Sequence, residues 1–425
     1  MNHDFILKGD FAWCADATAL KTSQNSYLIC EDGLSKGVYS SIPEKYAHLP
    51  VIDYSGKLII PGMVDLHLHA PQFAFRGLHM DEELLEWLNK YTFVEEARYA
   101  DPDYARLAYS QFASCLKNSA TTRAVIFATV HRPSTVILMD EMEKSGLVSY
   151  VGKVNMDREA PETILDASAD LSAYNTFGWI NETMGKYEHT YPILTPRFIP
   201  SCSNALLGEL KEIVHTYNIP IQSHLSENPG EVEWVHALMP ESEFYGDGYA
   251  RFDLFGKHAK TVMAHCIYSV EKEVELMKEN GVYVAHCPSS NMNLTSGIAP
   301  IRRYLEKGLH VGLGSDVAAG ESESIFSEIR ASIAVSKLYN RYVDESAKPL
   351  TFPEAFYLAT LSGGSFFGNV GSFEDGFELD AVVLNDEAEP HPQSLTIPER
   401  LERSVYLRAD KNRIEAKFVR GTKIL

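Results

Sequence analysis

Eight short apolar runs, separated by longer helix-like segments, are the feature that most constrains how this chain of 425 residues can fold. Short strands that alternate with helical segments are typical of a parallel sheet built from βα units. Eight such strands can close into a (β/α)8 barrel, whose functional side chains lie at the carboxyl ends of the strands. We therefore predict an α/β fold with a TIM-like barrel over residues 62–369. The runs are KLIIPGMVDLHLH (57–69), TTRAVIFATV (121–130), VSYVGKVNM (148–156), YPILTPRFIP (191–200), IPIQSHLSE (219–227), KTVMAHCIY (260–268), GVYVAHCPSS (281–290) and LHVGLGSDVAAG (309–320).

The two ends of the chain have a different pattern, with short strand-like pieces broken by polar turns. EDGLSKG (31–37) and DYSGK (53–57) are such turns near the N-terminus. ELDAVVLND (378–386) and the last segment (405–425) read as β-pieces around a turn. We expect residues 1–61 and 370–425 to pair into one small β-sandwich domain beside the barrel.

Charge and composition limit the classes of partner. The chain has 38 Lys plus Arg and 58 Asp plus Glu, a formal net charge of −20. So acidic a protein repels polyanions, which disfavours nucleic acid and anionic membranes as partners. The six cysteines form no CxxC pair, and no apolar run approaches the roughly 18 residues of a membrane span. The N-terminal stretch lacks the pattern of a secretion signal, so we expect a soluble cytoplasmic protein that binds a small molecule.

The HLH motif at 67–69 places two imidazoles two residues apart after an apolar run. On a strand, side chains at i and i+2 point to the same face, so His67 and His69 could reach one metal ion. Two histidines fill only half of a tetrahedral zinc shell, and a catalytic zinc usually has three protein ligands. Taken alone, the motif fits a metal site or two ordinary histidines.

Further polar side chains lie late in the later apolar runs, at the positions where a barrel carries its functional residues. They are His224 and Glu227 in the fifth run, His265 in the sixth, His286 in the seventh and Asp316 in the eighth. Each alone could be a loop hydrogen-bonding residue or a helix cap. Their joint occurrence at one end of a barrel favours a catalytic site, although we assign His286 structural support rather than a catalytic role.

These motifs, HxH, HxxE, His and SD in that order, resemble the metal-dependent amidohydrolase superfamily. More narrowly, several stretches are similar to the family of guanine deaminases, which hydrolyse guanine to xanthine and ammonia. The resemblance covers nearly the whole chain and implies a zinc-dependent hydrolase that is a homodimer. The stretches are PGMVDLHLHAPQF, LLEWLNKYTF, GKVNMDR, TPRF, SHLSEN, HCPSSNMNLTSG and GLGSDVAAG.

The resemblance also implies roles for individual residues. Zinc is expected on His67, His69, His224 and Asp316, a ligand set suited to Zn²⁺ that leaves a place for water. Glu227 is the expected general acid/base that protonates ring N3, while Asp316 takes the proton of the water. His265 is expected to stabilise the tetrahedral intermediate. Binuclear members of the superfamily carry a lysine late in the fourth strand, and YPILTPRFIP has none, so we expect one zinc per chain.

Substrate binding rests on fewer residues. The Gln72 amide can donate and accept, which matches the N3 and N9–H edge of guanine. Arg197 in TPRF offers only donors, which suit O6 and N7 of guanine and oppose the amino group of adenine. Phe198 could stack on the base or fill the core. The ligands His69 and His224 are also expected to border the substrate.

Two alternatives stay open on the sequence alone. The chain could be another deaminase of the superfamily, acting on cytosine, a triazine or an oxidised guanine, because the zinc ligands are common to many such enzymes. It could also be a barrel that serves only as a binding or scaffold protein. The complete set of ligands and proton-transfer residues argues against this second alternative.

Overall fold

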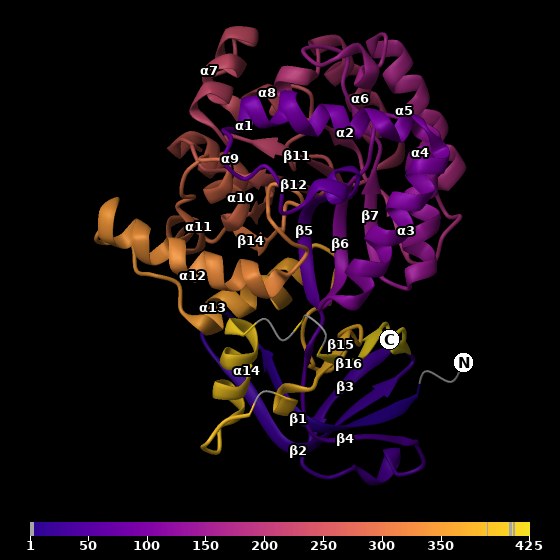
Figure 1. The fold of residues 1–425 in the computed structure, drawn as a ribbon, viewed down its shortest axis with the longest axis vertical. Coiled ribbons are helices and arrows are strands. Elements are labelled where there is room, and N and C mark those ends of the chain that lie inside the picture. The colour runs from indigo at the N-terminus through magenta and orange to yellow at the C-terminus, as the bar shows by residue number, and fades with distance from the viewer. Residues whose placement is uncertain (1–3, 389, 408–409, 411–412) are drawn as a thin grey trace.

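The computed structural model describes residues 4–388, 390–407, 410 and 413–425, which form a barrel and a small β-sheet beside it (Figure 1). Two parallel sheets of four strands make up the barrel, in the orders β5-β6-β7-β9 and β11-β12-β13-β14. Their bounds are β5 (Met63–His69), β6 (Thr121–Phe127), β7 (Val148–Gly152), β9 (Thr190–Pro192), β11 (Ile221–Leu225), β12 (Thr261–His265), β13 (Tyr283–His286) and β14 (His310–Leu313).

Hydrogen bonds at both seams close the two sheets into one barrel. On one side, Gln222 N donates to Leu194 O at 2.9 Å, next to an isolated parallel bridge between Leu194 and Ile221. On the other side, Asp316 N donates to His67 O at 2.8 Å and His69 N donates to Val317 O at 3.0 Å. The predicted (β/α)8 architecture is therefore confirmed.

Helices cover the outside of the barrel and follow the strands in alternation (Figure 1). Their apolar sides pack on the strands, and the largest buried cluster joins residues of both. The α-helices are α1 (Leu84–Trp87), α2 (Phe93–Ala97), α3 (Pro102–Asn118), α4 (Arg132–Ser145), α5 (Ala169–Thr183), α6 (Asn204–Tyr217), α7 (Pro229–Leu238), α8 (Tyr245–Ala250), α9 (Glu271–Asn280), α10 (Pro288–Asn293), α11 (Ile301–Lys307), α12 (Ile325–Tyr342), α13 (Phe352–Tyr357) and α14 (Ile397–Tyr406). Within the part of the chain that the structure describes, no helix is both long and apolar enough to span a membrane.

Four expected strands differ in detail, among them the third run, 148–156, which divides into β7 and β8 (Val154–Asn155). The first run, 57–69, divides at Gly62, and its first half lies in the small sheet. A Cβ at Gly62 would meet Thr122 Oγ1 at 2.1 Å. The fourth run, 191–200, breaks into β9 and β10 (Thr195–Pro196), and β10 pairs with β8 (Val154–Asn155). The prediction of β-structure from residue 405 is wrong at its start, because Val405 and Tyr406 end α14; residues 408–409 and 411–412 of that run lie outside the described residues.

The small sheet has seven strands in the order β17-β16-β15-β4-β1-β2-β3. Phe5 in β1 and Phe418 in β16 lie three strands apart, roughly 14 Å in a flat sheet, yet their ring centroids are 5.3 Å apart. The sheet therefore curls into two layers around an apolar cluster, as expected of a sandwich, while the exact domain boundaries stay a prediction. The strands are β1 (Phe5–Cys14), β2 (Leu20–Glu31), β3 (Leu34–Tyr39), β4 (Val51–Pro61), β15 (Ala381–Leu384), β16 (Ile414–Val419) and β17 (Thr422–Lys423).

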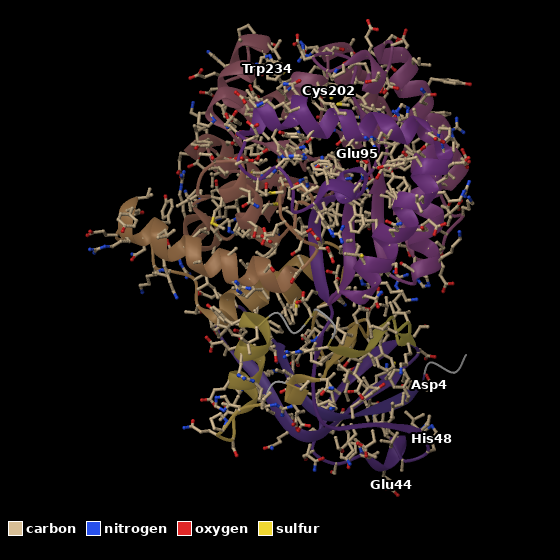
Figure 2. The ribbon with its side chains drawn as sticks, viewed as in Figure 1. Asp4, Glu44, His48, Glu95, Cys202 and Trp234 are labelled. Carbon is tan, nitrogen blue, oxygen red and sulfur yellow. The ribbon has the colours of Figure 1, made fainter. Side chains whose placement is uncertain are left out.

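A buried polar contact joins the small sheet to the barrel. Arg123 in β6 donates through Nε and Nη2 to both carboxylate oxygens of Asp380, at 2.6 and 2.9 Å, and neither side chain is exposed. Lys417 in β16 donates to the carbonyls of Lys117 and Thr121. These contacts lie at the amino-terminal end of the barrel strands. Figure 2 shows Trp234 and Cys202 at the opposite end of the molecule from Asp4, Glu44 and His48 of the small-sheet end.

Replacing Arg123 with Met should destabilise the protein strongly, because Asp380 is left as a buried charge without its partner. We expect the free energy of unfolding to fall by about 3–5 kcal/mol in urea titrations. Arg132→Met is the matched control, since Arg132 forms a partly exposed ion pair with Glu182 and should cost at most about 1 kcal/mol. Similar losses for both variants would contradict a special role for the buried contact.

Candidate active site

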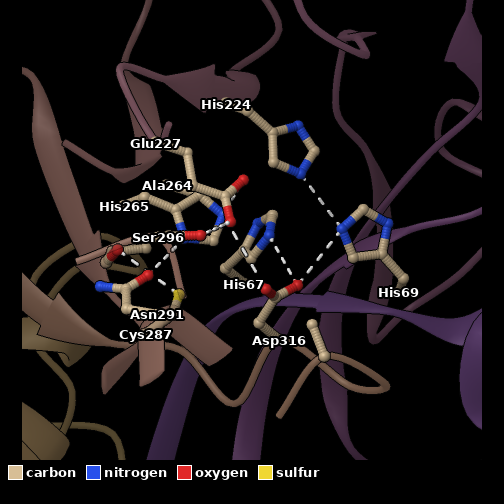
Figure 3. Close-up of polar contacts among 12 residues, drawn as sticks. His67, His69, His224, Glu227, Ala264, His265, Cys287, Asn291, Ser296 and Asp316 are labelled. Atoms are coloured by element: carbon tan, nitrogen blue, oxygen red, sulfur yellow. Dashed lines mark hydrogen bonds and ion pairs between the residues drawn. The ribbon is translucent and has the colours of Figure 1, made fainter. Parts of the chain in front are cut away.

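Four potential metal ligands converge at the carboxyl end of the barrel (Figure 3). His67 and His69 come from the end of β5, where the register with β6 shifts between Asp65 and Leu68, the irregularity expected of a bulge beside a functional site. Asp316 Oδ1 lies 3.2 Å from His67 Nε2 and 3.4 Å from His69 Nε2. The Nε2 atoms of His69 and His224 are 3.2 Å apart.

These distances fit a zinc ion better than hydrogen bonds among the side chains. Two ligands of one tetrahedral zinc, at bonds of about 2.0–2.1 Å, lie roughly 3.3 Å apart. Burial lowers the pKa of His67, and it lowers the pKa values of His69 and His224 well below the ordinary value, so all three imidazoles are neutral and can act as ligands. His67 Nε2 is buried and has no hydrogen-bond partner within the described structure, as expected of an atom reserved for a metal.

Neighbouring groups orient these ligands. His224 Nδ1 donates to the carbonyl oxygen of Arg197 at 2.6 Å, which leaves Nε2 as the free lone pair. Asp65 accepts from the backbone N–H groups of His67 and Ser315, at 3.2 and 3.0 Å. Hydrogen-bond partners of this kind fix the tautomer and direction of metal ligands. Asp316 itself has a φ of 47°, a left-handed conformation that residues other than glycine seldom adopt.

Glu227 and His265 lie next to each other beside the ligand cluster (Figure 3). His265 Nε2 lies 3.4 Å from Glu227 Oε2 and 3.8 Å from Asp316 Oδ2. On its other side, His265 Nδ1 donates to Asn291 Oδ1 at 2.9 Å. Ser296 Oγ donates to the second oxygen of Glu227 at 3.0 Å. The pair can therefore hold and exchange protons at fixed positions.

Burial and charge set the protonation of this pair. Burial raises the pKa of Glu227 to about 7, against the opposing effect of His265. Burial alone would lower the pKa of His265, but the carboxylates of Glu227 and Asp316 raise it above the ordinary value. For Asp316 burial acts to raise the pKa, and the imidazoles of His67, His265 and His69 hold it below the usual range. Glu227 thus titrates near neutral pH, the range suited to a general acid/base.

A cavity opens onto this cluster, and the predicted substrate-binding residues line it. Gln72, Arg197 and Phe198 all border the cavity together with His69 and His224. The ring of Phe198 also packs edge-on against Trp234, at 6.1 Å between centroids. Apolar side chains from the first helical segment and the loop after α10 complete the lining; they include Leu84, Trp87, Leu88 and Leu294.

His286 lies apart from this cavity. Its side chain is buried, and burial lowers its pKa to about 3. It borders a separate small cavity with Arg302 and Tyr339, and neither of its ring nitrogens has a hydrogen-bond partner among the described residues. The assignment of His286 to structural support stays a prediction.

Several residues of the site were not anticipated from the sequence. Asn291 and Ser296 hold His265 and Glu227, and both lie in the stretch HCPSSNMNLTSG, whose polar residues were the available signal. Glu96 contacts both Gln72 and Arg197 and lies on a helix with no distinguishing motif. Glu231 accepts from the backbone N–H of Glu227 at 2.9 Å and caps α7.

Comparisons with known proteins agree with this arrangement. Residues 58–423 match the model of the Amidohydrolase family. Guanine deaminase of Mus musculus is 39% identical over 383 residues, which are 87% of this chain and 83% of that protein. A crystal structure of guanine deaminase from C. acetobutylicum, with bound guanine in the active site, is similar at a TM-score of 0.96 and 43% identity, over 99% of this chain and 100% of that one.

A more distant neighbour shares the fold alone. The structure of an adenosine deaminase from Xanthomonas campestris, with bound zinc, matches at a TM-score of 0.82 and 19% identity, over 99% of this chain and 92% of that one.

Replacing Glu227 with Gln should stabilise the metal-free protein at pH 8. The folded pKa of about 7 exceeds the ordinary value of 4.5, so ionisation of Glu227 opposes folding, increasingly so between pH 4.5 and 7 and fully above. Gln avoids this penalty, about 3 kcal/mol at pH 8, and the advantage should vanish as the pH falls towards 4.5. Urea unfolding of both proteins across this range measures it. Glu275→Gln, on the exposed side of α9, is the control; an advantage of Glu227→Gln that does not change with pH would contradict the explanation.

Proposed function

This chain belongs to the amidohydrolase family, and from that we propose that it is a hydrolase that converts guanine to xanthine and ammonia. The observation that carries the proposal is the meeting, in one cavity, of a zinc-type ligand cluster, a carboxyl group that titrates near pH 7, and Arg197. The near-complete structural match to a guanine-bound guanine deaminase supports the same substrate.

Recognition of the base is assigned to Arg197 and Gln72. Guanine presents two acceptors, O6 and N7, on one edge, and Arg197 carries only donors. Adenine presents an amino group in place of O6, so donor would meet donor. Arg197 is 3% exposed, so water cannot form a hydrogen bond with a guanidinium donor that the substrate leaves unpaired. Sites of this kind discriminate strongly against the wrong substrate.

Proton transfer is assigned to Glu227, Asp316 and His265. We propose that protonated Glu227 delivers its proton to ring N3 of guanine, while Asp316 accepts the first proton of the attacking water. Glu227 then takes the proton of the hydroxyl group on C2 and transfers it to the departing amine, and Asp316 returns its proton to Glu227. His265, held by Asn291, donates a hydrogen bond towards the oxygen that becomes negative at C2. A zinc ion held by His67, His69, His224 and Asp316 would supply Lewis-acid chemistry that makes water nucleophilic at neutral pH.

We further propose that the protein is a homodimer that acts in purine catabolism in the cytoplasm. A cluster of exposed apolar side chains on and beside α12 supports an interface there. Met292, Leu338 and Tyr406 line one surface depression there, and Tyr342, at 79% exposure, and Val343 lie at the C-terminal end of α12. Patches of this kind commonly mark protein interfaces, and Figure 1 shows α12 projecting from the body of the barrel.

The metal proposal predicts about one zinc per chain in the purified protein. The cavity lining includes no lysine among the described residues that could bridge a second ion. Removal of the metal by a chelator should abolish ammonia release, and added zinc should restore it. Metal analysis of the protein before and after dialysis measures this; two tightly held metals per chain, or activity without any, would contradict the single-zinc site.

The substrate proposal predicts rapid ammonia release from guanine and little from adenine, cytosine or a triazine at the same concentration. Arg197→Met should raise the Michaelis constant for guanine and lower turnover, because the donors to O6 and N7 are lost. Its zinc content should stay normal, since the Arg197 carbonyl that orients His224 belongs to the backbone. Preference of the wild type for another base, or normal guanine turnover by the variant, would overturn the assignment.

A further inference from the structure

Glu96, on the short helix α2, touches both residues assigned to base recognition. Its Oε2 atom accepts from Arg197 Nη1 at 2.5 Å, and its Oε1 atom accepts from Gln72 Nε2 at 2.9 Å. The side chains of all three are nearly inaccessible to solvent. Glu96 is not among the residues lining the cavity, so it acts from behind the recognition residues rather than on the substrate.

The two contacts of Glu96 decide which hydrogen-bonding atoms face the cavity. Gln72 is held from both sides, since its Nε2 donates to Glu96 and its Oε1 accepts from the backbone N–H of Ala318 at 3.3 Å. The carboxylate accepts only, so it fixes which end of the Gln72 amide is oxygen. It also fixes Arg197 at one nitrogen, while the ring of Phe93, from the same helix, lies 5.2 Å from the guanidinium carbon.

Neutralisation is a second effect of the same contact. Arg197 is a buried cation at a site that also accumulates imidazoles and, when loaded, a metal ion. A buried charge is tolerated when it is paired and hydrogen-bonded. Glu96 provides that partner and leaves the remaining guanidinium donors of Arg197 for the base.

We propose that Glu96 is the positioning residue that determines specificity at this site, by fixing the donor pattern that Arg197 and Gln72 present to an oxo-purine edge. The proposal rests on guanine being the substrate. A fixed acceptor at Glu96 makes Arg197 a rigid donor group, which matches O6 and N7 and rejects an exocyclic amino group. With Gln at position 96, the donor pattern of Arg197 and Gln72 would no longer be fixed, because the Gln amide can donate as well as accept.

The test compares wild type, Glu96→Gln and Asp166→Asn. Gln keeps the shape of Glu96 but loses the charge and can turn its own NH2 towards Arg197 or Gln72. We expect the Michaelis constant for guanine to rise about 10- to 100-fold, as for misplacement of a positioning group, with a smaller fall in kcat and unchanged zinc content. Asp166→Asn removes the carboxylate of another buried pair, Lys153 with Asp166 at 3.1 Å, outside the cavity lining, and should leave the guanine Michaelis constant unchanged.

Binding of unreactive bases separates positioning from a general structural defect. Hypoxanthine carries O6 and N7 but lacks the 2-amino group, so its affinity can be measured by calorimetry without turnover. Glu96→Gln should weaken hypoxanthine binding by about 10- to 100-fold and reduce the preference for hypoxanthine over adenine. Equal weakening of both bases, or no weakening of either, would overturn the proposal.

A double variant separates action through Arg197 from a general structural defect. In Arg197→Met the cation is gone, so Glu96→Gln in that background should have a smaller effect on guanine kinetics than in the wild type. Additive effects would overturn the proposed action through Arg197. Failure of the wild type itself to release ammonia from guanine would overturn the substrate assignment and this inference together, and that outcome is visible before any variant is made.

Discussion

Closure of the barrel between β5 and the segment after β14 is the constraint on which the site depends. The hydrogen bonds from Asp316 N to His67 O and from His69 N to Val317 O hold the first and last strands in register at their carboxyl ends. Residues separated by about 250 positions in the chain thereby bring their ligand atoms within about 3.4 Å of each other. A shift of one residue at this seam would turn the ligands to the other face of the strand, so the fold and the metal site share one set of contacts.

Concentrating polar groups in this way opposes folding. Burial raises the pKa of Glu227 to about 7 and lowers the pKa values of the ligand histidines, which means that the charged forms are unfavourable there. His265 and Asp316 also adopt positive φ, at 70° and 47°, conformations that cost about 1–3 kcal/mol each. The surrounding strands and the extensive apolar core over-determine these conformations. A bound metal and substrate would then offset part of the electrostatic cost.

The sequence predicts the parts of this structure that local periodicity and strand-end position control. The eight apolar runs predict the barrel. The polar residues late in these runs predict the ligand cluster, because all parallel strands end at the same rim of a barrel. The sequence could not reveal that the run 57–69 divides at Gly62, because the close approach of Thr122 from β6 to this glycine is a tertiary contact. The contacts of Glu96 could not be predicted from the sequence either. A glutamate in a short helix usually faces solvent, and only the path of the chain from β5 to α3 turns this one towards Arg197.

Arg197 contacts both the ligand cluster and the cavity, through different atoms. Its backbone carbonyl orients His224, whereas its guanidinium pairs with Glu96 and faces the cavity. The position of the carbonyl depends on the path of the chain after β10, so it persists when the side chain changes. The backbone thus sets the carbonyl that orients His224, whereas the side chain of Glu96 on α2 holds the guanidinium. On the proposed assignment, changes at Gln72, Arg197 and Glu96 would alter the groups that face the heterocycle and would leave the ligand cluster of the barrel in place.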